Sequence, residues 1–237
     1  MKFKSRASSH GLLMTNPRLK ADREAGNLGE TAKGVVKDWY RSQLYMRKRQ
    51  IYSKYLEKGN ENEQDNLVFA TSMMGLPLTT ATNREFYEDE HFTGTPDLLF
   101  KDEGIVLDIK TSWDCYTFPL FDGEGNDPKY YWQMQVYMAL TGMTAGKVVY
   151  VLSNTPDPIV EREIKYAIRD LKDENGGEIS DEVTEKVKAE IMQFHNYDNI
   201  ESRYKLKVID YKYDPDDIDK ARAKVEKARE YLETIKF

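Results

Sequence analysis

The sequence predicts a mixed α/β or α+β domain in which helices pack against a central mixed β-sheet. Two observations lead to this prediction. Two apolar segments near the middle of the chain are separated by a short polar turn, which is typical of a β-hairpin. Segments with helical periodicity precede and follow that hairpin. The chain has 237 residues, and we expect residues 1–237 to form one domain.

The part of the chain before the hairpin is predicted to be helical. A helix over about 27–56 is expected to end at Gly59. A second helix is expected over about 61–74, with Leu67, Val68 and Ala70 on its apolar side. Gly75 and Pro77 should end it, because neither residue continues a helix easily.

The hairpin and the helix after it are the clearest elements. Residues 95–100 and 104–111 are predicted to be strands that a polar turn joins. Asp127-Pro128 then offers a helix N-cap and a proline suited to the first helical position. The helix should continue to about Leu140, with Gly142 just beyond its end.

The C-terminal part should add two strands and a final helix. The strands are expected over 147–152 and 204–213, and Asp214-Pro215 should begin the helix. Between the two strands, a segment at about 157–203 is treated as an insertion. Its helix-prone stretches are 159–171 and 180–194.

Composition limits the cellular setting. No segment reaches the roughly 18 consecutive apolar residues of a membrane span, and the basic N-terminus lacks the apolar run of a signal peptide. Cys115 is the only cysteine, so an intramolecular disulfide and a cysteine-rich zinc site are excluded. We expect a reduced, cytoplasmic environment and no membrane association.

The charge distribution bears on possible partners. A net charge of −6 by itself argues against binding to nucleic acid. However, residues 1–58 contain fourteen Lys/Arg and five Asp/Glu, a net charge of +9, so the rest of the chain carries −15. This asymmetry is compatible with a basic footprint for a polyanion, or with a solvated surface that has no partner.

Three charged residues on the hairpin point to chemistry. Asp108 and Lys110 share one face of their strand, because successive side chains alternate. Asp97, near the neighbouring strand, can lie beside them. The apolar run 105–107 precedes Asp108, so these charges adjoin buried backbone, where a charge is costly unless it is paired or bound to a metal. The alternative is a plain ion pair between Asp108 and Lys110.

The residue types favour a hard divalent cation. Converging carboxylates without His or Cys suit Mg²⁺ or Mn²⁺. Such a cation polarises a phosphodiester and makes hydroxide from bound water at neutral pH. A lysine beside it can orient or deprotonate the water, or stabilise the charge that develops on the phosphate.

The order of motifs resembles a known nuclease pattern. Pro96-Asp97, with Asp108-Ile109-Lys110 eleven positions after the first acid, resembles the PD-(D/E)xK nuclease superfamily. The segment 130–138 resembles the glutamine helix that follows this core in recombination exonucleases. Earlier, 59–65 resembles the helix that supplies a further acidic group, which here is Glu63. The joint order is more specific than any one segment.

The N-terminus extends the resemblance to one family, the viral recombination nucleases of the lambda-exonuclease type. Residues 6–11 are followed by Asn16-Pro17-Arg18. In that family a serine, and an arginine ten residues later, help hold the terminal 5′ phosphate, and Ser8 and Arg18 match this type and spacing. A hydroxyl and a guanidinium suit a phosphate monoester. Alternatively, Ser8 only caps the first helix.

The resemblance implies a restriction-endonuclease-like core and a role for each site residue. Asp97, Asp108, Glu63 and the Ile109 carbonyl would bind the metal, Glu63 directly or through water. Lys110 would act on the nucleophilic water, and Gln133 would position water or the scissile phosphate. Ser8 and Arg18 would bind the 5′ phosphate. His10, His91 and His195 are dispersed and are expected to be non-catalytic, and Trp113 and Trp132 are expected in the core rather than stacked on bases.

The resemblance also implies a substrate and partners. It implies removal of nucleotides from the 5′ strand at the ends of linear duplex DNA, in phage recombination or repair. A single-strand annealing protein is an expected partner, and a ring-shaped homotrimer is an expected assembly.

The chain departs from the family in two places. Asp108 stands where near relatives usually have glutamate, and residues 157–203 do not align. An endonuclease or junction resolvase on the same scaffold remains an alternative, as does a non-catalytic DNA-binding relative. A small-molecule enzyme is disfavoured, because the chain has neither a glycine-rich phosphate loop nor a nucleophile–histidine constellation.

Overall fold

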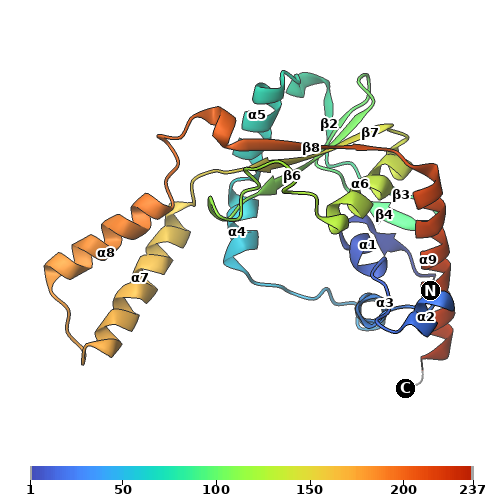
Figure 1. The fold of residues 1–237 in the computed structure, drawn as a ribbon, viewed down its shortest axis with the longest axis horizontal. Helices are drawn as coiled ribbons and strands as arrows, with labels where there is room; N and C mark the ends of the chain where they lie inside the picture. Colours follow the sequence, from blue (N-terminus) through green and yellow to red (C-terminus); the bar gives the residue numbers. More distant parts are fainter. Residues whose placement is uncertain (1, 236–237) are drawn as a thin grey trace.

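Two β-sheets form the centre of the fold (Figure 1). The computed structural model describes residues 2–235, and at residues 80–83 the backbone alone; Met1 and residues 236–237 of the expected domain lie outside it. The larger sheet has the order β2-β5-β6-β7-β8 and the smaller sheet the order β1-β4-β3. Their bounds are β1 Ser5–Arg6, β2 Ala81–Asn83, β3 Tyr87–Glu88, β4 Phe92–Gly94, β5 Leu98–Phe100, β6 Ile105–Thr111, β7 Ala145–Val151 and β8 Leu206–Lys212.

The larger sheet is mixed, as predicted. β5 and β6 pair antiparallel as a hairpin, with Leu98 opposite Leu107. β6 and β7 pair parallel, and β7 and β8 antiparallel. A parallel pair requires a crossover, and α6 (Pro128–Thr141) supplies it. Asp127 caps α6 by accepting a hydrogen bond from the Lys129 N–H, as the sequence predicted.

Helices cover both faces of the larger sheet, which confirms the predicted fold class. On one face, Val106 and Val148 join a core cluster with Met134 of α6 and Val225 of the C-terminal helix. On the other face, Leu107 and Val149 pack with Leu67 and Ala70 of α5. The remaining helices are α1 Ala7–Leu13, α2 Lys20–Glu24, α3 Glu30–Leu44, α4 Lys54–Glu61, α5 Glu63–Met74, α7 Asp157–Glu174, α8 Asp181–Phe194 and α9 Pro215–Thr234.

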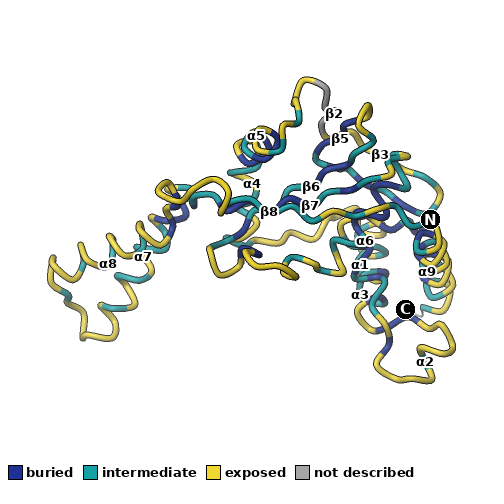
Figure 2. Tube along the Cα trace, turned by 45° about the horizontal axis from the view of Figure 1, so that its top comes forward, coloured by how far each residue is buried: buried dark blue, intermediate teal, exposed yellow. Residues whose placement is uncertain are grey.

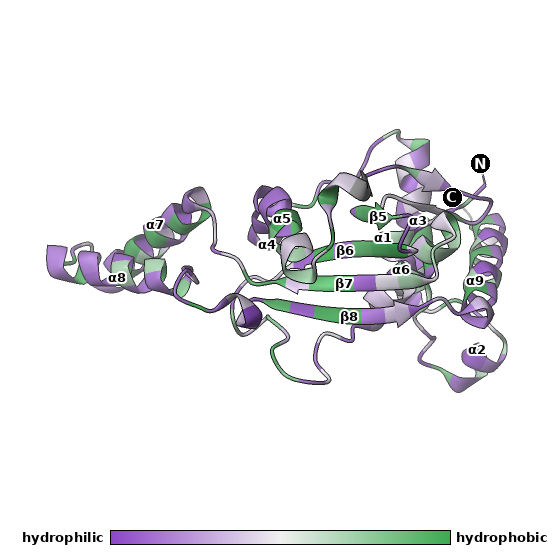
Figure 3. Cartoon of the chain, turned by 90° about the horizontal axis from the view of Figure 1, so that it is seen from above, coloured by the Kyte–Doolittle hydropathy of each residue, from purple (hydrophilic) through white to green (hydrophobic). Residues whose placement is uncertain are grey.

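Helices α7 and α8 form an arm that projects from the sheets (Figures 1 and 2). Only Ile159 and Val160, at the base of α7, are buried, and α8 buries none of its residues. Figure 3 shows hydrophilic colouring along much of the arm, in contrast to the apolar strands β6 and β7. The two helices occupy the predicted stretches 159–171 and 180–194.

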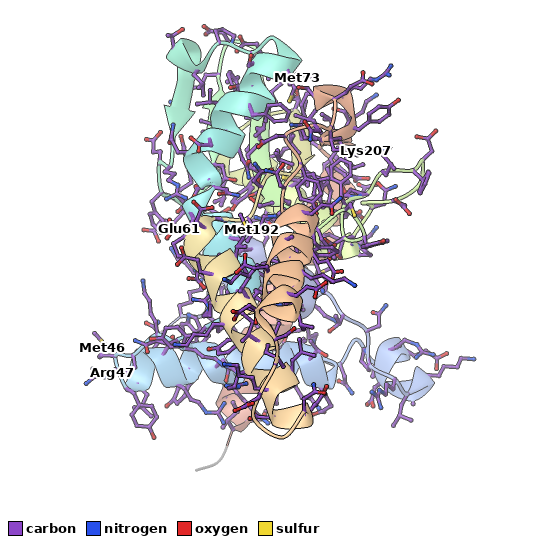
Figure 4. The ribbon with its side chains drawn as sticks, turned by 90° about the vertical axis from the view of Figure 1, so that its left-hand side faces the viewer. Met46, Arg47, Glu61, Met73, Met192 and Lys207 are labelled. Atoms are coloured by element: carbon purple, nitrogen blue, oxygen red, sulfur yellow. The ribbon has the colours of Figure 1, made fainter. Side chains whose placement is uncertain are left out.

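The prediction of one continuous helix over 27–56 is wrong, although α3 lies within that range. Helix α3 ends at Leu44, and Met46 has a positive φ of 52°. Met46 and Arg47 lie at the end of α3 in Figure 4. The next helix begins only at Lys54, where Ser53 caps it through the Tyr55 N–H. The intervening residues are mostly exposed and none is buried, so no apolar packing stabilises a helix there.

Gly59 does not end a helix as predicted, because it lies inside α4. The break falls at Asn62, whose side-chain amide donates hydrogen bonds to Ser153 Oγ and the Asn154 carbonyl. The next helix, α5, ends at Gly75 in the left-handed conformation, as predicted. Within α5, the prediction for Val68 is wrong: it is 47% exposed, although Leu67 and Ala70 are buried.

Candidate active site

Asp97 lies in the short connection between the two sheets, after β4 and directly before β5. Its Oδ2 accepts a hydrogen bond of 2.7 Å from the Ile109 N–H. Because Leu98 pairs with Leu107 in the hairpin, this connection lies opposite the middle of β6. The expected strand over 95–100 is therefore shorter than predicted, and it leaves Asp97 in a loop that β6 holds in place.

Asp108 and Lys110 lie on the face of β6 that α6 covers. They alternate with Leu107, which packs on α5 from the opposite face. The Lys110 ammonium lies 2.6 Å from Asp108 Oδ2, and the Asp108 side chain is only 4% exposed. Gln133 of α6 donates from Nε2 to Asp108 Oδ1 at 2.9 Å. The fold therefore brings together the three residues of the predicted centre and the predicted glutamine.

Gln133 connects both members of the ion pair to a tyrosine. Its Oε1 accepts from Lys110 Nζ at 3.3 Å, while its Nε2 also donates to the Tyr137 hydroxyl at 3.1 Å. That hydroxyl donates in turn to the Thr95 carbonyl at 3.2 Å. Tyr137 follows Gln133 by four residues, so both lie on one face of α6. This chain of contacts fixes the orientation of the amide.

The electrostatics of the site follow from two buried carboxylates. Burial and, next, the nearby charge of Asp108 together raise the pKa of Asp97 to about 7, although the Ile109 N–H and Lys110 act against this rise. Burial also opposes the charge of Lys110, but the carboxylate of Asp108 outweighs it, and the pKa of Lys110 is raised. The Lys110 ammonium also lies 4.5 Å from the centroid of the Tyr130 ring. The site can therefore accommodate additional positive charge.

These residues open into a cavity of about 730 Å³. Glu63, at the start of α5, lies in its wall and forms an ion pair with Arg84. Among the residues that the structure describes, the carboxylate oxygens of Glu63, Asp97 and Asp108 do not all lie within 4.8 Å of one another. Ile109 also lines the cavity.

The structure does not place Ser8 and Arg18 among the residues that line the cavity. Both are exposed, Ser8 in the first turn of α1 and Arg18 in the loop before α2. Ser8 is not the N-cap of α1, because Arg6 occupies that position. The alternative that Ser8 caps this helix is therefore wrong, and the predicted binding of a 5′ phosphate stays a prediction.

The three histidines lie outside the lining of the cavity. Burial lowers the pKa of His10 to about 3, and its Nδ1 lies 2.9 Å from Ser5 Oγ. His195 is buried beside Thr155, and His91 pairs with Glu226.

The two tryptophans differ in position. Trp132 packs against the main core cluster, in agreement with the prediction. Trp113 instead lines the cavity, with its ring 5.0 Å from that of Tyr55. Its position two residues after the end of β6 could have indicated this, because Thr111 and Ser112 at that strand end also line the cavity.

Sequence reasoning missed two arginines of the cavity, Arg6 and Arg84. In the sequence, Arg6 stands out only as part of the N-terminal motif, and Arg84 lies between strands β2 and β3, which are too short to show alternation. No local signal identifies either residue, since each reaches the cavity through the pairing of distant segments.

The fold and the geometry of this site define the class of the chain: it has an exonuclease fold. A solved structure of a phage-related exonuclease from Haemophilus somnus 129PT is 25% identical, with a TM-score of 0.73; the match covers 98% of this chain and 94% of that one. The alkaline exonuclease LHK-Exo from Laribacter hongkongensis is 15% identical, with a TM-score of 0.64; the match covers 97% of this chain and 88% of that one. A further structure shows LHK-Exo in complex with dAMP.

These comparisons confirm the resemblance to nucleases of the lambda-exonuclease type that the sequence motifs indicated. No protein-family model and no curated protein matches the chain. Among the described helices, none combines the length and the apolar character needed to cross a bilayer.

Proposed function

We propose that the protein is a divalent-metal-dependent DNA exonuclease. The observation that carries this proposal is the pair of buried carboxylates, Asp97 and Asp108, held beside Lys110 in a cavity of a chain with an exonuclease fold. The substrate would be linear duplex DNA, degraded from the 5′ strand at its ends. The proposed setting is phage recombination or repair in the cytoplasm.

The residues present fit Mg²⁺ or Mn²⁺. The donors are carboxylate oxygens, which these ions prefer. Asp108 Oδ2 is buried, and the Lys110 ammonium lies 2.6 Å from it. Asp97 and Asp108 would hold the ion, with the Ile109 carbonyl as a neighbouring ligand and Glu63 contributing directly or through water. When bound, such an ion polarises the phosphodiester and acidifies its water.

The chain's own residues would perform the remaining tasks. Lys110, oriented by Asp108 and Gln133, would orient the attacking water and offset negative charge that develops on the phosphate. Gln133 would keep the Asp108 carboxylate in place, because its amide is itself held by Tyr137. The Arg84 guanidinium pairs with Glu63, so Glu63 would have to exchange this partner to contribute to an ion site.

The proposal extends to partners. The net charge of +9 over residues 1–58 supports contact with the DNA backbone. Lys and Arg side chains that bind phosphates release the counterions condensed on the DNA, which favours binding. Ser8 and Arg18 would hold the 5′ phosphate of the end. A single-strand annealing protein would receive the product strand, and a homotrimer would encircle the duplex.

One experiment separates this function from its nearest alternative. Linear and covalently closed circular duplexes of one sequence are incubated with the protein and Mg²⁺. An exonuclease degrades the linear duplex and leaves the circle intact. Cutting of the circle at a comparable rate would favour the endonuclease or resolvase, and cleavage of neither would favour the non-catalytic DNA-binding relative.

A further inference from the structure

Arg6 faces the cavity because of its place on β1. The preceding residue, Ser5, is buried, and its hydroxyl lies 2.9 Å from His10 Nδ1. Since side chains alternate along a strand, the side chain of Arg6 points the opposite way, and Arg6 is exposed and lines the cavity. Ala7 then begins α1. The strand therefore ends by directing one guanidinium toward the site.

The cationic side chains that line the cavity differ in their partners. Lys110 pairs with Asp108, and Arg84 pairs with Glu63. In the described part of the chain, the Arg6 guanidinium forms no ion pair within 4.0 Å and no hydrogen bond. Its charge is therefore available to a ligand, in a cavity whose wall also carries the carboxylates of Glu63, Asp97 and Asp108.

Arg6 lies close to the reactive centre through β4 and α6. Arg6 pairs with Thr93 across β1 and β4. At the next residue, Gly94, an added Cβ would lie 2.8 Å from Tyr137 Cε1, so the Tyr137 ring packs directly on this strand. Burial raises the pKa of Tyr137, and the positive charge of Arg6 acts against that rise. Tyr137 in turn contacts Gln133, which binds Asp108 and Lys110.

Close packing of α1 on α6 maintains this arrangement. A Cβ at Gly11 would lie 2.5 Å from the Lys129 Cα, so the backbone of α1 contacts the first turn of α6. Ser5 N–H donates to the His91 carbonyl at 2.8 Å, which fixes β1 at the start of β4. The position of Arg6 is therefore set by backbone contacts on both sides of it and does not depend on a flexible loop.

We propose that Arg6 binds a phosphate group of the DNA strand in the cavity and sets the position of that strand relative to Asp97, Asp108 and Lys110. This inference rests on the proposed function and adds a substrate-positioning residue to it. A guanidinium offers two parallel N–H donors that match two oxygens of a phosphate. The same chemistry fits a terminal 5′ phosphate and an internal phosphodiester, so the experiment must distinguish these two sources.

The test compares Arg6→Ala, Arg6→Lys and the charge-matched control Arg169→Ala. Arg169 is an exposed arginine of the projecting arm that pairs with its neighbour Asp170. Steady-state kinetics on linear duplex in Mg²⁺ should show kcat/KM of Arg6→Ala reduced by ~10- to 150-fold, the range for one charge-assisted hydrogen bond, mainly through KM. Arg6→Lys should recover part of the loss, and Arg169→Ala should match the wild type. Equal kcat/KM for Arg6→Ala and wild type would overturn the inference.

Binding provides a readout that does not need catalysis. The anisotropy of a labelled duplex is measured at several salt concentrations in Ca²⁺. For Arg6→Ala, the slope of log Kd against log salt should be smaller than for wild type by about 0.9, the value for one phosphate contact. An unchanged slope and affinity would overturn the inference, even if the wild type proved to have no nuclease activity. Absence of cleavage by the wild type, with a reduced slope for Arg6→Ala, would refute only the proposed nuclease function.

Two substrates identify the phosphate. If the Arg6→Ala defect appears equally with 5′-phosphorylated and 5′-hydroxyl ends, the contact is to an internal phosphodiester. If it appears only with the phosphorylated end, the contact is to the terminal phosphate. Either result supports the inference. With either outcome, Arg6→Ala should unfold at the same temperature as the wild type, because the Arg6 side chain contributes no described contact to the fold.

Discussion

Asp97 Oδ2 accepts a hydrogen bond from the Ile109 N–H, at 2.7 Å, between the positions of Asp108 and Lys110. This contact fixes a loop acid to the strand that carries the other acid and the lysine. It also shows why the eleven-position spacing matters: the hairpin pairs Leu98 with Leu107, which places Asp97 level with the charged end of β6. The contact therefore joins the two halves of the proposed metal site.

Removing the divalent ion should stop cleavage. The proposed ion is held by carboxylates, so excess EDTA should abolish hydrolysis, and Mg²⁺ or Mn²⁺ should restore it. Ca²⁺ should bind without supporting turnover. The measurement is release of acid-soluble nucleotide from linear duplex. Undiminished release in EDTA would refute the metal-dependent mechanism.

The ion should also stabilise the folded protein. It would bind beside Asp97, whose charged form is disfavoured by burial and by the neighbouring carboxylate of Asp108. We expect the unfolding temperature to rise on addition of Mn²⁺, and the rise to be lost in Asp97→Asn, because binding to the native state alone shifts the unfolding equilibrium. An equal rise in wild type and Asp97→Asn would place the ion elsewhere.

Gln133→Ala should lower kcat while leaving DNA binding almost unchanged. Gln133 holds both Asp108 and Lys110, and groups that orient a metal ligand typically contribute about 10- to 100-fold in activity. Tyr137→Phe removes only the support of the amide and should have a smaller effect. The comparison of kcat for the two variants checks this order. A greater loss in Tyr137→Phe would show that Tyr137 acts by another route.

Gly94→Ala should destabilise the protein and impair the site together. An added Cβ would lie 2.8 Å from Tyr137 Cε1 and force the ring to move. We expect a loss of about 1–3 kcal/mol in the free energy of unfolding, as for other overpacked sites. The control is Gly34→Ala in α3, where an added Cβ meets nothing within 4 Å and should stabilise the helix by about 0.5–1 kcal/mol. Denaturant unfolding of both variants tests the difference in sign.

The 5′ phosphate prediction concerns Ser8 and Arg18. If they bind the terminal phosphate, 5′-phosphorylated duplex should be degraded faster than 5′-hydroxyl duplex. Arg18→Ala should remove this preference by slowing only the phosphorylated substrate, by an amount equivalent to about 1.5–3 kcal/mol. Equal rates on both ends in wild type would show that the N-terminal match is coincidental.

The elements that the sequence predicted well are those whose signal is local. The hairpin, the D-x-K strand and α6 with its cap all depend on alternation, turn residues or a capping pair within a few positions. The helix over 27–56 was wrong because helical propensity continues through residues 45–53 although packing does not. A sequence pattern contains no information on whether an apolar partner exists for such a segment.

The parts of the site that the sequence did not predict depend on long-range contacts. Arg6 reaches the cavity because β1 pairs with β4, more than 80 residues away in the chain. Arg84 reaches it from the segment before β3, and its pairing with Glu63 changes how that acid can contribute. The small sheet β1-β4-β3 has strands of two or three residues, too short for alternation to be recognised.

The most direct test of the central claim is the rate at which linear duplex is degraded in Mg²⁺ by the wild type, Asp97→Asn, Asp108→Asn and Lys110→Ala, each shown to be folded by its circular dichroism. We expect each variant to lose nearly all activity. A double variant should be little worse than a single one, because groups that act as one unit are non-additive. A Lys110→Ala variant that keeps most of its activity with metal present would contradict the assignment of this site.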